Sequence, residues 1–468
     1  MRAMTEELAN HVANYKKMTL TEDILQQVKR VLLDYFCCAI TGSQTVVSKQ
    51  VFQTLLELEG EGDYHVIGHK KKLSKTNAAF INGTIAHSLD LDDGHTKGSI
   101  HPGTVVLPPL LAEAEKGKPN FDLLARAIVI GYDVCLRISS ALHPSSRKRG
   151  FHNTPVAGIF GAVAGLCVLN ELNKKEVQNA FGIAASFAGG IFAFLGTGAE
   201  VKRIHPGQAA RDALLAVELS LNGLTGPKSV LESENGLFQA FAGADISSER
   251  LLQNLGKTFE ISNIYFKPYP CCRHIHSSVD AVYKLKEKNE IKVEDIVRIR
   301  VGVNSIAYKH RHHECQSLLD AQMSLPYTVA LALLYPTLEI GHFAPENSTS
   351  QCRNLASKVE VYIDEYAETV YPNERAAKVE INVADGSTLM ELIHNPLGEP
   401  SHPLDDAQLA AKFYGNCKSI IGEEKTEEMI ANIFNIEKEI DFLYKSFHNN
   451  NIATDYKGWI KHSKGVSK

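Results

Sequence analysis

Residues 82–109 read NGTIAHSLDLDDGHTKGSIHPGTVVLPP, and this stretch concentrates acids and imidazoles in a window with few other charges. The acids are Asp90, Asp92 and Asp93, and the imidazoles are His87, His95 and His101. Apolar residues recur at helical spacing from Phe80 to Leu89, which predicts a helix ending near Asp90, and the glycines that follow predict a loop. Such a junction suits proton transfer, because it brings acids and bases to a backbone that a small ligand can approach. The alternative is a capped helix end followed by a solvated polar turn.

The composition bounds the class of protein. The chain has 468 residues, of which 44% are hydrophobic and 22% charged, as expected for a soluble globular protein of two or three domains. A net charge of −5 and the lack of a long basic run argue against a nucleic-acid partner. Nine cysteines without the spacing of a disulfide framework, and an N-terminus without an apolar signal core, predict a cytoplasmic protein.

One uncharged run, residues 181–198, is long enough to raise the question of a membrane span. It holds five glycines and many small residues, which favour a tightly packed core helix followed by a turn. We therefore expect no membrane partner.

Helical patterning dominates the first 265 residues. Thr19 and Glu22 predict a capping box for a helix that ends near Gly42. The apolar run from Val156 to Leu169 carries three glycines, which predicts a helix buried against close neighbours.

The pattern changes to a strand period near Phe266 and returns to a helical one from Asp405. Between these points we expect a helix at 324–334 and strands at 297–303, 359–363, 379–383 and 388–393, the last two joined by an Asp385-Gly386 hairpin turn. The sequence thus predicts a mainly α protein with an inserted α+β domain. The expected division is a large all-helical domain from residues 1–265 and 398–468, and a smaller lid domain from residues 266–397.

Other groups with potential for chemistry lie outside the opening stretch. They are His152, the pair Lys202 and Arg203, the run from Lys267 to His276 that contains Cys272 and Arg273, and the cluster from His310 to Cys315. Each also has a structural interpretation: a satisfied core histidine, a solvated basic face, or inert buried thiols. Neither acid–histidine cluster has a recognised zinc spacing, so we expect no metal. Together the cations indicate a basic cavity around one acid cluster, which suits a small polycarboxylate.

Five segments together resemble the MmgE/PrpD family, which includes 2-methylcitrate dehydratases, cis-aconitate decarboxylases and iminodisuccinate epimerases. They are AHSLDLDD with HPG (86–103), GFHNT with GIFGA (150–162), KRIHPGQAA (202–210), KPYPCCRHIH (267–276) and DAQMSLPY (320–327). The resemblance implies a helical domain made from both ends of the chain, a lid inserted between them, a homodimer, and chemistry without a cofactor. It places the active site between the helical domain and the lid.

The resemblance also implies the site residues. The catalytic set is Asp90, His101, His152, Lys202 and Lys267. We expect the substrate to be bound in addition by Asp93, Arg203, Cys272, Arg273 and His276. The sequence departs from the decarboxylase branch at Gly94, where that branch has threonine, and at Cys272, where a histidine is expected. The spacing from Gly94 to His101 is also one residue longer.

The expected reaction moves a proton at a carbon next to a carboxylate of a small di- or tricarboxylate, such as cis-aconitate or 2-methylcitrate. Lys202 and Lys267 would hold a carboxylate and stabilise enolate-like charge. His101 or His152 would be the base, oriented by Asp90. A lyase, either decarboxylase or dehydratase, is the first interpretation, and an epimerase of an amino-dicarboxylate-type substrate is the second. A carboxylate-binding protein without turnover is the third.

Overall fold

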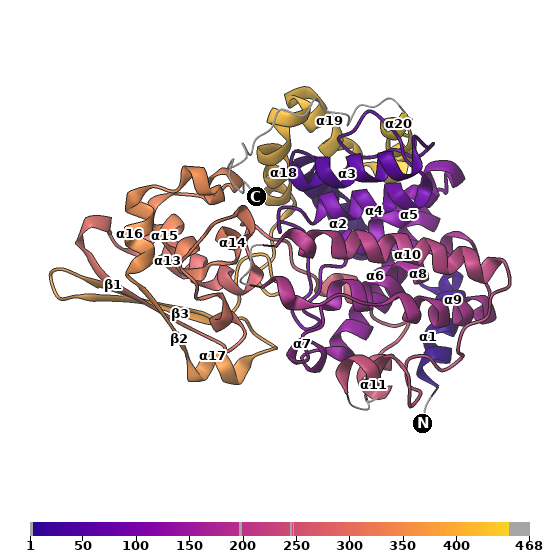
Figure 1. The fold of residues 1–468 in the computed structure, drawn as a ribbon, viewed down its shortest axis with the longest axis horizontal. Helices are drawn as coiled ribbons and strands as arrows, with labels where there is room; N and C mark the ends of the chain where they lie inside the picture. Colours follow the sequence, from indigo (N-terminus) through magenta and orange to yellow (C-terminus); the bar gives the residue numbers. More distant parts are fainter. Residues whose placement is uncertain (1–2, 196–198, 244–245, 247, 449–468) are drawn as a thin grey trace.

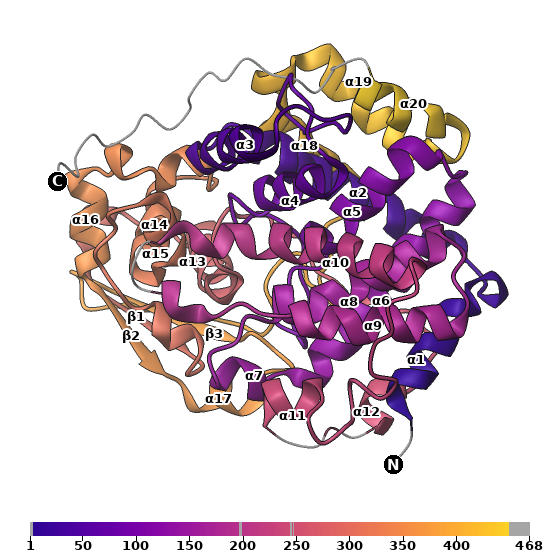
Figure 2. The same ribbon diagram turned by 45° about the vertical axis from the view of Figure 1, so that its right-hand side comes forward.

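The computed structural model describes residues 3–195, 199–243, 246 and 248–448. Figures 1 and 2 show a larger helical part beside a smaller part built around a sheet. This arrangement confirms the prediction of a mainly α fold with a smaller α+β portion. The ends of the chain, residues 1–2 and 449–468, lie outside the described residues, as do residues 196–198 of the uncharged run.

The larger part contains helices from both ends of the chain. They are α1 (Met4–Ala13), α2 (Glu22–Gly42), α3 (Val46–Glu59), α4 (Lys75–Ala86), α5 (Gly103–Gly117), α6 (Phe121–Leu142), α7 (Ser145–Lys148), α8 (Asn153–Leu169), α9 (Lys174–Phe187), α10 (His205–Leu221), α11 (Leu237–Ala242), α12 (Ser248–Leu252), α18 (Asp406–Ile421), α19 (Glu423–Phe434) and α20 (Ile436–His448).

Helix α8 is the buried centre of this part, as its run of apolar residues and glycines predicts. Every residue from Asn153 to Val168 is buried. A Cβ added at Gly161 would lie 2.5 Å from the carbonyl oxygen of Gly131 on α6, so the two backbones pack too closely for any larger residue. The glycines of the motif thus serve helix packing, and they bring the N-terminus of α8 to a fixed position beside the candidate site.

The sequence-based bounds of two helices were wrong by a few residues. Helix α2 begins at Glu22 with Thr21 as its N-cap, whose hydroxyl accepts from the Ile24 amide at 3.4 Å, in place of the predicted Thr19 box. Helix α4 ends at Ala86 and not near Asp90. The apolar pattern continues past Ala86 because Leu89, which lies outside the helix, packs into the core of the sheet part.

The smaller part holds a four-stranded sheet in the order β2-β1-β3-β4. Its strands are β1 (Ile296–Val303), β2 (Val359–Ile363), β3 (Ala377–Val383) and β4 (Thr388–Ile393). Strand β1 pairs with β2 in parallel and with β3 antiparallel, and β3 and β4 form the predicted hairpin. The helices of this part are α13 (His276–Lys288), α14 (Leu318–Met323), α15 (Leu325–Leu334), α16 (Ser350–Ser357) and α17 (Glu365–Val370).

Two hydrophobic cores underlie the two parts. One combines side chains from Met4 to Phe266 with side chains from Leu404 to Leu443. The other consists mainly of side chains from Cys271 to Ile393, with α13 against β3 and β4 and α15 against β2. The C-terminal helices therefore pack back onto the N-terminal ones: Asp406 accepts from Arg30 at 2.6 Å, and Lys412 donates to Asp34 at 2.6 Å.

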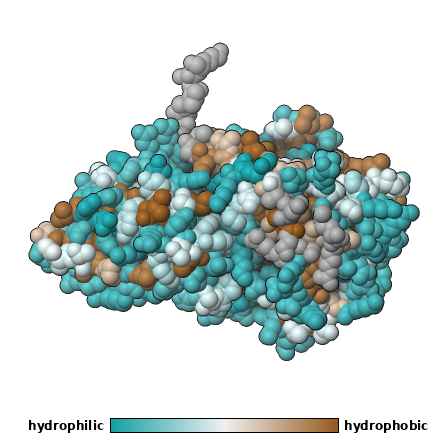
Figure 3. All heavy atoms as spheres, turned by 90° about the horizontal axis from the view of Figure 1, so that it is seen from below, coloured by the Kyte–Doolittle hydropathy of each residue, from teal (hydrophilic) through white to brown (hydrophobic). Residues whose placement is uncertain are grey.

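On the face drawn in Figure 3, hydrophilic residues cover most of the described surface, and hydrophobic ones form small separate groups. Within the described residues, no single helix is long and apolar enough to cross a membrane. Helices α2 and α3 meet the length and composition of a span only when taken together, and they are bent by 84° relative to each other.

Candidate active site

A cavity lies where loops of the helical part meet the start of α13 and loops of the sheet part. The space between its walls, including open solvent at its mouth, is about 550 Å³. The helical part contributes Asp90, Ser99, Ile100, His101, Arg147, His152, Phe192, Phe194, Leu195, Lys202 and Tyr265 to its lining. The sheet part contributes Cys272, Arg273, His274, His310, Met323 and Arg375.

Asp90 sits in the turn that follows α4. Its φ of 51° lies in the left-handed region, which aspartate tolerates better than most residues. This turn aims the carboxylate at two lysines: Oδ1 lies 2.6 Å from Nζ of Lys202 and 3.1 Å from Nζ of Lys267. Lys267 also donates to the Asp90 carbonyl oxygen at 2.7 Å. One carboxylate thus pairs with two ammonium groups in the buried wall of the cavity.

The charges of this trio reinforce one another. Burial alone would raise the pKa of Asp90, but Lys202 and Lys267 hold it well below its ordinary value. Burial likewise lowers the pKa of Lys267, while Asp90 raises it above its ordinary value overall. Asp90 and Lys267 are therefore both charged at neutral pH, and the Lys202 side chain contacts the same carboxylate.

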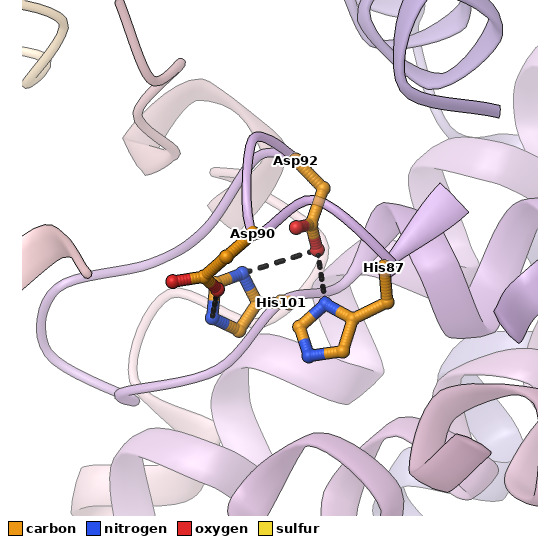
Figure 4. Close-up of side chains that lie close together, drawn as sticks. All are labelled: His87, Asp90, Asp92 and His101. Carbon is orange, nitrogen blue, oxygen red and sulfur yellow. Dashed lines mark hydrogen bonds and ion pairs between the residues drawn. The ribbon is translucent and has the colours of Figure 1, made fainter. Parts of the chain in front are cut away.

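His101 lines the cavity next to this trio, and Figure 4 shows its ring between the carboxylates of Asp90 and Asp92. Its Nδ1 lies 3.2 Å from Oδ2 of Asp92 and 3.0 Å from the carbonyl oxygen of Asp93. Its Nε2 lies 3.9 Å from Oδ1 of Asp90. Because Nδ1 faces acceptors, it carries the proton in the neutral ring, and Nε2 is left as the basic nitrogen. Asp92, and not the predicted Asp90, therefore orients this imidazole.

His152 lies at the N-terminus of α8 and is the second predicted imidazole in the cavity lining. Its Nδ1 shares a hydrogen bond of 3.0 Å with Nδ1 of His205, and its ring contacts Phe192 at a centroid distance of 4.8 Å. Burial, followed by the nearby His205 and Lys202, holds the pKa of His152 well below its ordinary value. The imidazole is therefore neutral at physiological pH, which suits a base or a hydrogen-bond donor.

Two arginines in the lining have no carboxylate partner among the described residues. The guanidinium of Arg147 lies 3.5 Å from the ring centroid of Phe192. Arg375 donates to Oγ1 and the carbonyl oxygen of Thr96, both at 3.3 Å, and to the His274 ring at 2.8 Å. Neither guanidinium forms an ion pair with a residue that the structure describes, so both charges are available to an anionic ligand.

We call Asp90, His101, Lys202 and Lys267 the Asp90 group, and Arg147, His274, His310 and Arg375 the arginine group. The members of the second group lie close to one another: the rings of His274 and His310 stack at 5.9 Å. Arg147 acts electrostatically on both of these histidines. One group is thus internally paired, whereas the other carries positive charge into the cavity.

Three of the predicted substrate-binding residues do not line the cavity. The carboxylate of Asp93 is buried and accepts from the Gly103 amide at 3.0 Å and from the Tyr132 hydroxyl at 2.8 Å, so it holds the loop in place. Arg203 is buried beside Glu200, 3.6 Å away. His276 is fully buried and contacts the carbonyl oxygen of Cys271 at 3.1 Å. The structure keeps these three side chains out of the cavity lining, because proximity in sequence does not fix which way a side chain points.

Arg273 and Lys267 lie at the cavity but are held by other protein groups. Arg273 binds Glu399 at 3.0 Å and stacks on Tyr265 at 4.4 Å, so its charge is already balanced. Lys267 is fully buried behind Asp90 and is not part of the lining. Cys272, in contrast, lines the cavity.

The departure at Gly94 has a structural counterpart. A Cβ at Gly94 would lie 2.3 Å from the hydroxyl oxygen of Tyr265, so this tyrosine occupies the space of a larger residue. Gly94 and Tyr265 also exchange backbone hydrogen bonds of 3.0 and 2.7 Å. Burial raises the pKa of Tyr265 to about 12, which keeps its hydroxyl protonated. The cavity therefore gains a phenolic donor beside the site of this departure.

Several residues of the site carry little signal in the sequence. Asp92 was noticed in the acid cluster but was not assigned a role. Arg147 stands in a short basic run, SSRKR (145–149), and Arg375 stands in YPNERAA (371–377) without a recognisable motif. His310 belongs to a cluster of metal-ligand residue types for which no metal was expected, and only His310 of that cluster lines the cavity. Spacing relative to the known motifs was not informative for any of these residues.

One group of side chains has the chemistry of metal ligands. One atom each from His87, Asp90, Asp92 and His101 lies within 4.8 Å of the others. In this structure several atoms of these side chains are used otherwise: Asp92 Oδ2 binds the Nδ1 atoms of His87 and His101, at 2.8 and 3.2 Å, and Asp90 Oδ1 binds two ammonium groups. The residues fit a hydrogen-bonded network of alternating charge better than a divalent ion.

The sequence also matches known families and proteins. Residues 6–249 match the MmgE/PrpD N-terminal domain, and residues 269–435 match the MmgE/PrpD C-terminal domain. The chain is 28% identical to a cis-aconitate decarboxylase-like protein of Aspergillus oryzae, over 94% of this chain and 95% of that protein. It is 26% identical to a cis-aconitate decarboxylase of Aspergillus terreus over 94% of each chain, and 28% identical to that of Homo sapiens over 93% and 92%. The chain therefore belongs to the MmgE/PrpD family, as the sequence motifs predict.

Proposed function

We propose that this chain is a lyase that acts on a small di- or tricarboxylate of the cis-aconitate type. The observation that carries the proposal is the combination, in one cavity, of unpaired arginines with an imidazole whose Nε2 is free to exchange a proton. The relatives named as cis-aconitate decarboxylases support this substrate class. The family motifs and the described network support chemistry by proton transfer without a cofactor.

The chemistry of cis-aconitate shows what the site must do. One arm of this molecule is a methylene that joins a carboxylate to an alkene carbon. Loss of carbon dioxide from this arm leaves an electron pair, which spreads through the alkene to the carbon next to the opposite carboxylate. Protonation of that carbon shifts the double bond and completes the product. The enzyme must therefore hold the remaining carboxylates, stabilise the delocalised charge, and supply one proton.

Each requirement has a candidate in the cavity. The guanidinium groups of Arg147 and Arg375 would hold carboxylates, because neither is neutralised by a protein acid. Lys202 lines the cavity and would stabilise the enolate-like charge, with Asp90 fixing its position. His101, oriented through Nδ1 by Asp92, would exchange the proton through Nε2. His152 would serve as a neutral donor or as a second base.

The same set of groups serves two alternative reactions. A dehydratase would remove the proton next to a carboxylate and expel a hydroxyl group. An epimerase of an amino-dicarboxylate would remove the proton and return it on the other face. A binding protein would hold the acid and form no product. We rank the decarboxylase first, because it matches the names of the relatives. We also propose a cytoplasmic homodimer in which the sheet part acts as a lid.

The test is a screen of small di- and tricarboxylates in deuterated water, read by proton NMR. Decarboxylation releases carbon dioxide and places deuterium in the product, dehydration yields an alkene, and epimerisation returns labelled material of unchanged formula. We expect His101→Ala to suppress both turnover and labelling by about 10²-fold or more. His313→Ala is the control, because His313 is exposed and outside the cavity. Normal product formation with both His101 and His152 replaced by alanine would refute the imidazole mechanism.

A further inference from the structure

Cys272 and His310 meet at the cavity, although they are far apart in the sequence. Sγ of Cys272 lies 3.7 Å from Nε2 of His310, within the range of a sulfur hydrogen bond. On the other side of the ring, Nδ1 of His310 lies 3.0 Å from the carbonyl oxygen of Met323. Since a carbonyl only accepts, Nδ1 keeps its proton and Nε2 is turned toward the thiol. Both residues line the cavity together with Asp90, His101 and Lys202.

The charged surroundings favour transfer of the thiol proton to the imidazole. The charged groups around Cys272 include His310, Asp90, Lys267 and Arg147. Burial alone would raise the pKa of Cys272, but His310 and Lys267 lower it to about 7. Burial alone would lower the pKa of His310, but Cys272 raises it above its ordinary value, against the effect of Arg147. His274 adds a stacked ring that burial holds neutral.

Other cysteines of the chain do not share these surroundings. Burial raises the pKa of Cys135, Cys167, Cys271, Cys315 and Cys352 above the ordinary value. Cys271 is adjacent to Cys272 in the sequence, yet it is fully buried in the core of the sheet part and does not line the cavity. The position of Cys272 at the cavity wall thus separates it from an inert structural thiol.

We propose that Cys272 and His310 form a proton-transfer pair on the sheet side of the cavity, and that Cys272 delivers a proton to the substrate carbon. This inference rests on the proposed function for the identity of the acceptor, a carbanion next to a carboxylate. The pair shares one dissociable proton between Sγ and Nε2. The proton passes from Nε2 back to Sγ, and its delivery then forms a C–H bond, breaks the S–H bond, and leaves a thiolate beside a neutral imidazole. Water returns the proton to the pair before the next turnover.

The pair complements His101 on the helical side. With one proton-transfer group on each side of the cavity, a proton can leave through one group and arrive through the other. His310 does not itself touch the substrate in this scheme; it positions and polarises the thiol. The family resemblance predicts a histidine at position 272, and a histidine there could perform the same transfer. The thiol of Cys272 would thus perform the proton transfer that an imidazole at this position could perform.

The first test is independent of any substrate. Alkylation of the full chain by iodoacetamide should follow thiolate formation, with a midpoint near pH 7 for Cys272, as identified by peptide mass spectrometry. His310→Asn retains a donor for the Met323 carbonyl but removes the imidazole. This variant should shift the alkylation midpoint of Cys272 upward by about one pH unit or more, because the imidazolium of His310 is lost while the thiol stays buried. A wild-type midpoint at or above the value of about 8.5 of a free cysteine would overturn the pair.

The second test measures turnover. Cys272→Ala should lower kcat by about 10²-fold, the usual contribution of a positioned acid, and Cys272→His should recover most of it. Cys315→Ser is the matched control and should retain both turnover and the alkylation of Cys272, because Cys315 lies outside the cavity. Full turnover by Cys272→Ala would refute the catalytic role, even if the thiol reacts readily.

The two tests also separate this inference from the proposed function. If the wild-type protein converts none of the polycarboxylates, the proposed function fails, and the substrate role of Cys272 fails with it. The alkylation midpoints still decide in that case whether the pair exists. If the wild type turns over and Cys272→Ala turns over equally well, the proposed function stands and the catalytic role of Cys272 is wrong.

Discussion

The Asp90 group and the arginine group share one cavity, but only in the Asp90 group are the cations paired with an acid of the protein. In the Asp90 group, every cation has an acid within 3.1 Å, and the shared carboxylate belongs to the protein. In the arginine group, Arg147 stacks on a ring and Arg375 binds neutral groups, so the counter-charge must come from outside. The first arrangement fixes geometry before a ligand arrives, and the second leaves binding energy for the ligand.

This difference distinguishes two roles, the stabilisation of developing charge and the recognition of the substrate, which sequence motifs alone do not distinguish. Internally paired charges are preorganised, so they stabilise developing charge without moving at the moment of reaction. Unpaired charges recognise the substrate, because they gain most from an incoming carboxylate. Lysines in the family motifs were expected to do both. The geometry instead favours lysines for charge stabilisation and arginines for binding, and this division can be tested one group at a time.

The largest effect should come from removing the shared acid. Asp90→Asn keeps the shape of the side chain and tolerates the left-handed backbone, but it leaves two buried ammonium groups without a counter-ion. Breaking a buried ion pair from one side costs about 3–5 kcal/mol, so we expect a loss of that order in the free energy of unfolding, together with loss of turnover. Chemical denaturation at neutral pH measures the first, and the NMR assay the second.

The pH dependence of this loss supplies its control. The pKa of Asp90 is lower in the folded state than in the unfolded chain, where it is about 3.9. Its contribution is therefore fully present above about pH 4 and is lost as the pH falls toward the folded-state pKa. The stability difference between wild type and Asp90→Asn should be constant at neutral pH and should shrink in acid. A difference that does not change in acid would show that the lost stability has another origin.

The next effect should distinguish the two lysines. Lys202→Met should lower kcat/KM by about 2–4 kcal/mol with little change in stability, because Lys202 lines the cavity. Lys267→Met should lower stability as well, since Lys267 is fully buried and also holds the Asp90 carbonyl. Kinetics and thermal unfolding of the two variants measure this contrast. Near-normal turnover of Lys202→Met would remove lysine from the proposed stabilisation of charge.

Much of the fold could be predicted because side-chain periodicity reports burial directly. The strands at Val297–Val303 and Thr388–Ile393 and the glycine-rich helix α8 were found in this way. The end of α4 was misplaced for the same reason. Leu89 continues the apolar period of the helix, but it is buried in the other core, beyond a turn with a left-handed aspartate. Periodicity shows that a residue is buried but not which core buries it.

The candidate site was predictable only where its residues form compact motifs. Asp90 and His101 were found because a single loop carries both. The partners of Asp90 are 112 and 177 residues away, so the pairing that neutralises the lysines is a property of the tertiary structure. Arg375 enters the cavity from the sheet part without a local motif. Sequence alone therefore gave the acids, bases and lysines, but not which charges remain unpaired.

A smaller effect should follow from removing one unpaired arginine. Arg147→Met should raise KM with a limited change in kcat, because a guanidinium–carboxylate bond contributes to binding in both ground and transition states. A hydrogen bond to a charged group is worth about 1.5–3 kcal/mol, which corresponds to a rise in KM of roughly tenfold to a hundredfold. Steady-state kinetics with the best acid from the screen gives both constants.

Arg147→Lys is the matched control for this prediction. It retains the positive charge but loses the planar pair of donors, so it should recover only part of the affinity. If the methionine variant binds the acid normally, Arg147 is a structural residue that packs on Phe192, and the arginine group does not bind the substrate. A fall in kcat with unchanged KM would instead place Arg147 among the groups that act in the transition state.

The smallest effect is expected from metal removal. His87, Asp90, Asp92 and His101 together resemble a ligand set, but their facing atoms already bind one another or the two lysines. A divalent ion would have to displace both ammonium groups or stand beside them, which costs electrostatic energy in a buried site. The lysines also supply the positive charge that a metal would otherwise contribute. We therefore expect turnover to be unchanged after treatment with EDTA and dialysis.

The outcome that would contradict this expectation also identifies where the ion would bind. Among the described residues, Nε2 of His87 and Oδ1 of Asp92 are buried without a hydrogen-bond partner, so these two atoms could accept an ion without breaking an existing contact. If EDTA abolishes turnover and a divalent ion restores it, His87→Gln should weaken the restoring ion. Asp90 and His101 would then belong to a metal site. The substrate would be bound by a metal ion on one side of the cavity and by the arginine group on the other. If turnover survives, the ammonium groups paired with Asp90 are sufficient for the chemistry, and the buried imidazole of His87 serves only to hold Asp92 against His101.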